Sequence, residues 1–189
     1  MPTTSSSTSS RTTRAQYFEV GLELLAEGGA PSVTIDALCT RLRVTKGSFY
    51  HHFHGGRDYM EQLLVWWEDR HGHRLAREAL AVKGPTTLIP QLKAAVAYAV
   101  HHEAESAIRA LAMSDAFAAE VQRRVDQGRE EVLVDLYRAA GMDDDTARTS
   151  ARIGMAILIG TQQRERPVDR DRLHTLLAEY QRWIETRLP

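Results

Sequence analysis

The chain has 189 residues, of which 43% are hydrophobic and 26% are charged, the proportions of a globular protein with one large or two small domains. A net charge of −1 excludes a basic nucleic-acid coat protein, and the single cysteine, Cys39, excludes an intrachain disulfide. The sequence contains neither an apolar run of the roughly 18 residues needed to span a membrane nor the apolar centre of a signal peptide. These features predict a protein of the reducing cytoplasm, with Cys39 packed in a core.

The N-terminal region begins with residues 1–10, which are almost all serine and threonine and predict a disordered polar tail. Arg11 and Arg14 follow it, and they either grip a phosphate or begin a solvated helix; the sequence favours the second reading. A first helix is predicted from Arg14 to Glu27, with an apolar face made by Ala15, Phe18, Leu22 and Leu25.

Two short helices joined by a tight turn are predicted next. Thr34 is expected to cap the first of them, because its hydroxyl can accept a hydrogen bond from a free backbone N–H of the first turn. The apolar residues then recur at i, i+3 and i+7, namely Ile35, Leu38 and Leu42. Residues 43–44 form the turn, and Thr45 caps the second helix. Both helices are too short to be stable alone, so they must pack on the first helix.

The second short helix has few bulky aliphatic residues. Phe49 and Phe53, four positions apart, form a narrow apolar edge. Its other side chains are hydrogen-bonding residues: Lys46, Ser48, Tyr50, His51 and His52. A helix that is anchored on one edge and presents donors elsewhere is suited to the groove of an anionic partner. This pattern is typical of the second helix of a helix-turn-helix.

Residues Thr34–Phe53, followed by Gly55-Gly56-Arg57, resemble the DNA-binding domain of the TetR family of transcription regulators. The run Thr-Lys-Gly-Ser-Phe-Tyr and the ending Phe-Tyr-His-His-Phe carry the resemblance, which extends over about residues 11–71. The chain departs from the family at two positions. Arg43 stands where the family usually has glycine, and a non-glycine residue in a left-handed turn costs about 1 kcal/mol. His51 replaces a frequent aromatic residue.

The resemblance implies which residues touch DNA. Three match positions that contact the phosphate backbone: Lys46, Tyr50 and His52. Four are placed for bases or for close approach to the groove: Thr45, Gly47, Ser48 and His51. Thr34 and Arg43 complete the predicted contact set, and Arg43 could reach a phosphate.

The rest of the chain is predicted to be helical throughout, which gives an all-α fold. Helices are expected from about residue 57 to about 80, from residues 86–87 to near 102 after a break at 83–85, and from 103 to about 114. A long helix is expected between Asp115 and Gly141, another from residues 143–145 to about 163, and a last one from Asp169 to Leu188. The predicted organisation is a three-helix DNA-binding bundle over residues 11–71 and a larger helical effector-binding and dimerisation domain over residues 72–189.

The last two helices are predicted to form the interface of a homodimer. Residues Ile153–Gly160 are apolar all round, and the final helix has a continuous heptad-like apolar face. The predicted interface residues are Ile153, Gly154, Ile157, Leu158, Leu176, Tyr180, Trp183 and Ile184. The alternative is that both helices belong to the core of a single chain.

A pocket for a small-molecule effector is implied by the resemblance alone, and no particular effector is indicated. The candidate lining residues are amphipathic or adaptable side chains: Trp66, Trp67, Tyr98, His102, Met113, Phe117 and Met155. Each of these residue types is more often found at an ordinary core position than in a pocket.

An enzyme is the competing class of function, and the sequence argues against it. The clusters His71-Gly72-His73 and His101-His102-Glu103 place neighbouring side chains on different faces of a helix, so neither can easily chelate one ion. Glycine patterns for nucleotides and nucleophilic serines do not occur. We therefore expect no catalytic residue, metal or cofactor. The predicted function is a homodimeric repressor, released from a pseudo-palindromic operator by an effector; the alternative is an architectural DNA-binding protein that needs no effector.

Overall fold

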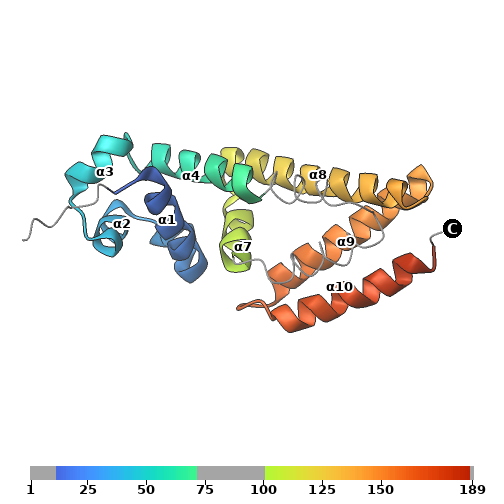
Figure 1. Cartoon of the computed structure of the whole chain (residues 1–189). Helices are drawn as coiled ribbons and strands as arrows, with labels where there is room; N and C mark the ends of the chain where they lie inside the picture. The colour runs from blue at the N-terminus through green and yellow to red at the C-terminus, as the bar shows by residue number, and fades with distance from the viewer. Residues whose placement is uncertain (1–11, 72–100, 188–189) are drawn as a thin grey trace, which may run out of the picture.

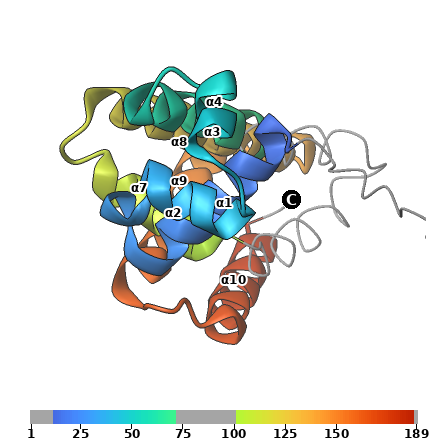
Figure 2. The ribbon, with the colours of Figure 1, turned by 90° about the vertical axis from the view of Figure 1, so that its left-hand side faces the viewer.

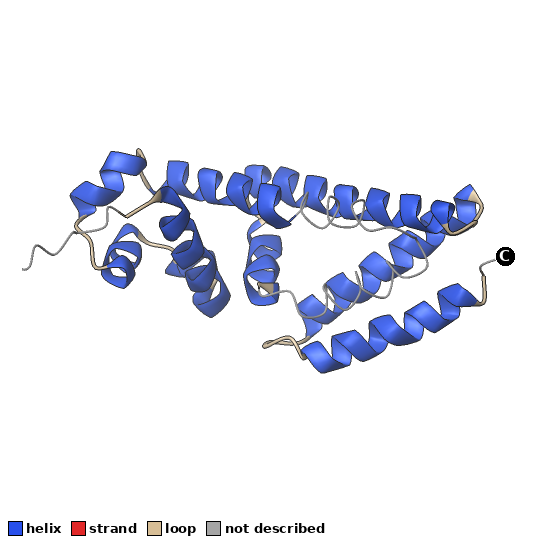
Figure 3. Ribbon diagram, in the orientation of Figure 1, coloured by secondary structure: helices blue, strands red, loops and turns tan. Residues whose placement is uncertain are grey.

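The computed structural model describes residues 12–71 and 101–187, and every regular element in these ranges is helical (Figure 3). The predicted all-α fold is therefore confirmed. The elements are α1 (Arg14–Gly28), η1 (Ala30–Ser32), α2 (Ile35–Leu42), α3 (Lys46–His52), α4 (Gly56–His71), α7 (His102–Leu111), α8 (Ala116–Ala139), α9 (Asp144–Arg164) and α10 (Arg170–Glu185). The predictions for the tail 1–10, the break at 83–85 and Tyr98 lie outside the described residues.

Several helices begin at the side-chain caps that the sequence predicts. The hydroxyl of Thr34 accepts from the backbone N–H of Ala37 at 3.1 Å, and that of Thr45 accepts from Ser48 at 3.3 Å. Aspartates cap the later helices in the same way, at positions Asp115, Asp143 and Asp169. Each cap satisfies one of the backbone donors that the first turn leaves unpaired, so these boundaries are fixed locally.

The core of the N-terminal bundle is aromatic. Phe49 and Phe53, the predicted apolar edge of α3, are fully buried, and they meet Tyr17 of α1 at ring-centroid distances of 5.9 and 5.4 Å. The prediction for α1 was wrong at Ala15, which is exposed; Tyr17 lies on the buried face instead. A phenol ring buries far more apolar area than a methyl group, so the larger side chain faces the core.

The helices form an elongated molecule, with α1–α3 at one end and α9–α10 at the other (Figure 1). Seen from the end that carries α2 and α3, α7 lies beside α1 (Figure 2). The core of the bundle continues into α7 and α8 through Ile108, Val121 and Val125. Two ion pairs also tie α4 to α8: Arg57 lies 2.7 Å from Asp115, and Arg124 lies 2.6 Å from Glu68. The position of α4 is therefore coupled to that of α8.

A buried ionic network joins α7 to α8. Glu105 accepts two hydrogen bonds from the guanidinium of Arg129, at 2.6 and 3.1 Å, and Arg109 makes a similar pair with Asp126, at 2.6 and 2.9 Å. Burial by itself would raise the pKa of Glu105. The attraction and hydrogen bonds of Arg129, helped by Arg109, outweigh burial and hold that pKa below its ordinary value. Glu105 is therefore ionised and paired.

The α9–α10 hairpin buries much of the predicted dimer interface within one chain. Four of its residues are buried by the chain's own helices, so they are not available to a partner: Gly154, Leu158, Tyr180 and Ile184. A Cβ added at Gly154 would lie 3.1 Å from Cε1 of Tyr180, which explains the glycine without a second chain. Leu176 and Trp183 remain 41% and 37% exposed, while Ile153 and Ile157 are half-buried.

Candidate nucleic-acid interface

The turn between α2 and α3 sets the direction of the candidate reading helix. Arg43 adopts the left-handed conformation with φ 55° and ψ 44°, as its place in the predicted turn requires. The backbone N–H of Val44 donates to the carbonyl of Cys39 at 3.0 Å and closes the turn. A non-glycine residue in this conformation costs about 1 kcal/mol. The Arg43 side chain is exposed and adds a cation at this turn.

The outer face of α3 carries most of the predicted DNA contacts. Thr45, Lys46, Gly47, Tyr50 and His51 are all exposed, while Phe49 and Phe53 hold the opposite edge in the core. Tyr50 rests edge-on against Phe49, with ring centroids 5.5 Å apart, so its hydroxyl is carried outward on a supported ring.

Gly47 has no packing reason to be glycine. A Cβ built there would meet only Oγ1 of Thr45, at an ordinary 3.6 Å. Glycine inside a helix costs about 0.5–1 kcal/mol relative to alanine, so its presence at this exposed position needs another reason. The missing side chain leaves room for close approach of a groove.

Ser48 and His52 differ from the exposed predicted contacts of α3, because they are half-buried and form hydrogen bonds with residues at or near the start of α1. The hydroxyl of the buried Tyr17 donates to Oγ of Ser48 at 3.2 Å. The ring Nε2 of His52 lies 3.0 Å from the carbonyl of Thr12, and Arg14 donates to the carbonyl of His52 at 2.9 Å. A carbonyl oxygen can only accept, so Nε2 of His52 carries the proton. Through these contacts both residues anchor α3 to the start of α1, and Nε2 of His52 is not directed at DNA.

The N-terminal bundle as a whole is not positively charged, and its charged side chains form individual ion pairs. Residues 12–71 contain six basic and eight acidic residues, so the region has no overall attraction for phosphate. Nζ of Lys46 lies 2.7 Å from Oδ1 of Asp36, and this hydrogen-bonded carboxylate raises the pKa of Lys46. Arg41 is paired in the same way with Glu27, through two bonds at 3.0 and 2.7 Å.

Sequence reasoning missed two of these partners. Asp36 was expected only as a favourable charge in the first turn of α2, although an acid and a lysine that open two consecutive short helices can meet across the turn. The contacts of Arg14 and Thr12 with His52 join residues 38 and 40 positions apart, and no sequence signal points to them.

The predicted effector-binding residues do not form one pocket among the described residues. Trp67 is buried in the core of the bundle, and Met155 is buried on α9. His102 is buried too, with Nδ1 at 2.9 Å from Nε2 of Gln162. Met113 is 87% exposed beyond the end of α7. Large apolar side chains serve packing more often than ligand binding, which explains most of these placements.

Trp66 and Phe117 do come together. They line a depression of about 510 Å³ between α1, α4 and α8. The other lining residues are apolar, acidic or, at one position, a neutral amide: Phe18, Asp58, Glu61, Gln62, Val65 and Asp69. The ring of Trp66 lies 5.4 Å from that of Phe18, and Arg70 covers it at 4.8 Å. The residues that line this depression belong to α1 and α4 of the N-terminal bundle and to α8.

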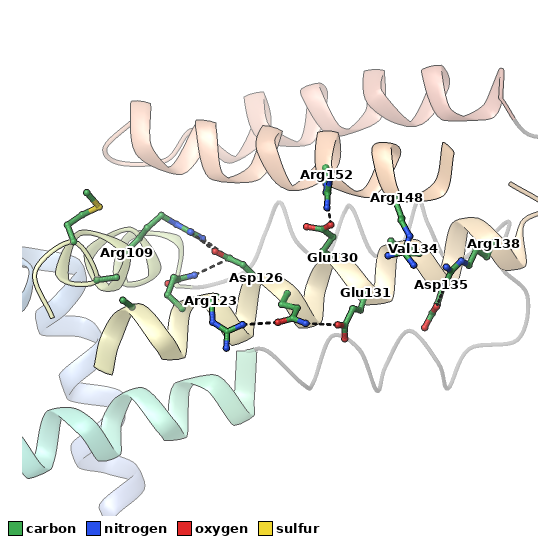
Figure 4. Close-up of a pocket in the computed structure, with 15 residues that line it drawn as sticks. Arg109, Arg123, Asp126, Glu130, Glu131, Val134, Asp135, Arg138, Arg148 and Arg152 are labelled. Carbon is green, nitrogen blue, oxygen red and sulfur yellow. Dashed lines mark hydrogen bonds and ion pairs between the residues drawn. The ribbon is translucent and has the colours of Figure 1, made fainter. Parts of the chain in front are cut away.

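A larger groove of about 920 Å³ runs along α8 between the end of α7 and α9 (Figure 4). Its walls are charged, and the charges pair within the groove, as between Arg152 and Glu130 at 3.0 Å. Gln127 bridges Arg123 and Glu131 at 3.0 and 2.9 Å. Of the residues predicted to bind an effector, Met113 alone lines this groove.

Residues 12–71 and 101–187 lack two features. No helix in these ranges is long and apolar enough to cross a membrane. In the same ranges, no cluster of three or more histidine, cysteine, aspartate or glutamate side chains is arranged to hold a metal ion.

Comparison with known proteins places the candidate interface in a family. Residues 18–58 match the family described as bacterial regulatory proteins, tetR family. No curated protein is similar enough in sequence to match the chain.

Solved structures share the fold at low sequence identity. A TetR transcriptional regulator from Legionella pneumophila is 13% identical with a TM-score of 0.76, over 96% of this chain and 100% of that one. A transcriptional regulator from Rhodococcus sp. Rha1 is 17% identical with a TM-score of 0.73, over 93% and 96%. A regulator from Saccharomonospora viridis, solved in complex with choline, is 14% identical with a TM-score of 0.72, over 88% and 94%. The chain therefore contains a segment that matches the tetR family at its helix-turn-helix, and it shares its overall fold with solved transcriptional regulators of that type.

Proposed function

We propose that this chain is a homodimeric repressor that binds a pseudo-palindromic operator through α3 and leaves it when a small molecule binds. The observation that carries the proposal is the division of α3 into two edges. Phe49 and Phe53 are buried, whereas Lys46, Gly47 and Tyr50 are presented together to solvent. A helix of this kind fits the major groove of B-DNA, which is wide enough to admit it.

Within the proposal, the contacts fall into three groups. Lys46, Tyr50 and Arg43 bind phosphate, while Thr45, Gly47 and His51 approach base edges. Thr34 can add a phosphate contact at the start of α2. Ser48 and His52 chiefly hold α3 in place, as their contacts with Tyr17 and Thr12 require.

Selection of DNA fragments by the purified protein, followed by sequencing and footprinting, tests the proposal. A dimeric regulator is expected to select one short inverted repeat whose half-sites lie about one helical turn, roughly 34–36 Å, apart. The alternative, an architectural DNA-binding protein without an effector, predicts broad protection without a selected motif. Enrichment of no sequence at all would contradict the proposal.

Lys46→Ala is expected to weaken binding to every DNA sequence by a similar factor. A lysine that contacts phosphate releases about one counterion, so the slope of log K against log salt should become shallower by about 0.9. Titrations of operator and random duplex at several salt concentrations measure both quantities. Arg70→Ala, which removes an exposed cation from α4, is the control and should change neither. An unchanged slope in Lys46→Ala would remove Lys46 from the phosphate contacts.

The proposed dimer uses the exposed faces of α9 and α10. Leu176 and Trp183 lie seven positions apart on α10 and so share one face, with Arg187 stacked over the Trp183 ring at 3.5 Å. Leu176→Asp is expected to convert the dimer to monomer in sedimentation equilibrium, because a buried unpaired charge is strongly unfavourable. Ala178→Asp adds the same charge at an exposed site on another face of α10 and should leave the dimer intact. A stable Leu176→Asp dimer would move the interface elsewhere.

A small-molecule effector is the remaining part of the proposal. The choline complex of the Saccharomonospora viridis regulator gives a precedent for a small ligand on this fold. In the present chain, the depression at Trp66 and Phe117 touches both α4 and α8, which the Arg57–Asp115 and Arg124–Glu68 pairs hold together. A ligand that prefers one arrangement of these helices shifts the population toward it. A screen for compounds that release operator DNA tests this step.

A further inference from the structure

The ion pair between Lys46 and Asp36 lies within the candidate DNA-binding surface. Asp36 is in the first turn of α2, two residues after Thr34, and Lys46 is the first residue of α3. Their charged atoms are 2.7 Å apart, and both side chains are largely exposed, Lys46 by 61% and Asp36 by 72%. The pair is therefore open to any anion that approaches the start of α3.

Helix electrostatics explain why these two residues attract each other at this place. The N-terminus of a helix carries a partial positive charge, so it disfavours Lys46 at the start of α3 and favours Asp36 at the start of α2. The Asp36 carboxylate thus gives the Lys46 ammonium an anionic partner, which the N-terminus of α3 does not provide. A DNA phosphate would offer the same kind of oxygen at the same place.

The other exposed cation pairs of the bundle do not compete with DNA in this way. Arg70 pairs with Glu19 between α4 and α1, at 2.9 Å. Arg57 pairs with Glu61 and with Asp115, the residue that caps α8, and Arg41 pairs with Glu27 and Glu23 of α1. Asp36 is different because its partner, Lys46, is itself a proposed phosphate contact.

We propose that Asp36 is an internal competitor of DNA phosphate for Lys46, and that it sets the affinity and salt dependence of DNA binding through that lysine. The inference rests on the proposed function, in which α3 faces DNA. When Lys46 turns to a phosphate it must give up Asp36, or else hold the carboxylate close to the phosphate backbone. Either event weakens binding by a similar factor on every sequence, because neither involves a base.

Asp36→Asn tests the proposal by removing the charge while keeping the size and the polar character of the side chain. We expect about two- to fivefold tighter binding to operator and to random duplex alike, since an exposed ion pair is worth up to about 1 kcal/mol. The slope of log K against log salt should steepen by up to about one unit. Glu19→Gln makes the same change in net charge away from α3 and should change binding less than twofold.

A double mutant separates competition for Lys46 from direct repulsion of DNA. In a Lys46→Ala background, Asp36→Asn should improve binding by less than about twofold, because the competed cation is gone. A full gain in that background would show that Asp36 repels phosphate directly and would overturn the proposal. So would an unchanged or weaker affinity of Asp36→Asn itself.

Two controls keep this result independent of folding and of the operator. Circular dichroism and thermal unfolding verify each variant, and Asp36→Ser replaces Asp36→Asn if the asparagine variant fails to fold. The random-duplex titrations need no operator. If no operator is selected but the random-duplex results agree with competition, the proposed repressor function fails and Asp36 keeps its role. A wild-type protein that binds no DNA even at low salt would refute both.

Discussion

Arg129→Met is expected to lower the free energy of unfolding by about 3–5 kcal/mol, because it leaves a buried carboxylate without its main partner. Arg129 and Glu105 are both nearly inaccessible to solvent, and two hydrogen bonds join them. Without Arg129, the nearest cation is Arg109, whose Nη2 lies 3.5 Å from Oε1 of Glu105 and whose guanidinium is already engaged by Asp126. Chemical denaturation of the full chain measures the loss.

The pH dependence of stability should change in the same variant. Because the folded-state pKa of Glu105 is held below its unfolded value, its ionised form stabilises the fold above the unfolded pKa, about 4.3, and this contribution is lost as the pH falls through the lower folded value. Wild-type protein should therefore lose stability steeply on acidification below about pH 4.5. Arg129→Met should lose less of its remaining stability over that window.

Arg123→Met is the matched control for this experiment. Arg123 lies on the same helix and also binds a glutamate through two hydrogen bonds, to Glu120 at 3.0 and 2.7 Å, but the pair is exposed. Its removal should cost no more than about 1 kcal/mol. Equal losses in the two variants would show that burial of the Glu105–Arg129 pair does not set its contribution.

Phe53→Ala is expected to destabilise the N-terminal bundle by about 3–5 kcal/mol and to abolish operator binding. The ring of Phe53 is fully buried against Phe49, Tyr59 and Tyr17, at centroid distances of 5.2, 5.0 and 5.4 Å. Its loss opens a cavity where α1, α3 and α4 meet. Thermal unfolding and operator titration measure the two effects.

Two variants separate packing from DNA contact in this experiment. Phe53→Leu retains most of the buried volume and should lose less stability than Phe53→Ala. Tyr50→Ala removes an exposed ring from the outer face of α3, so it should weaken DNA binding while changing stability by less than about 1 kcal/mol. A Phe53→Ala protein with wild-type stability would show that the aromatic cluster does not hold α3.

The sequence by itself determined the features that depend on residues close together in the chain. The caps at Thr34 and Thr45 could be predicted because a capping side chain bonds a backbone N–H only three residues away. The buried edge of α3 followed from the spacing of Phe49 and Phe53. The all-α class followed from helical periodicity along the chain, and the resemblance to a family followed from a contiguous motif.

The tertiary structure alone decided which polar residues of α3 hold this helix against α1 and the residues just before it. Ser48 and His52 sit on the same short helix as Lys46 and His51 and have similar hydrogen-bonding groups. Ser48 contacts Tyr17, which lies 31 positions away in the chain, and His52 contacts Thr12, which lies 40 positions away. Helical periodicity predicts which residues share a face, but it does not predict which distant segment packs on that face.

The same limit applies to the C-terminal helices. An apolar helix such as Ile153–Gly160 needs cover on every side, and the sequence does not distinguish cover by the same chain from cover by a second copy. The fold assigns Gly154, Tyr180 and Ile184 to the chain's own core and leaves Leu176 and Trp183 exposed. The physical reason is that burial depends on how α8, α9 and α10 pack together, and that packing arises only once the whole chain has folded.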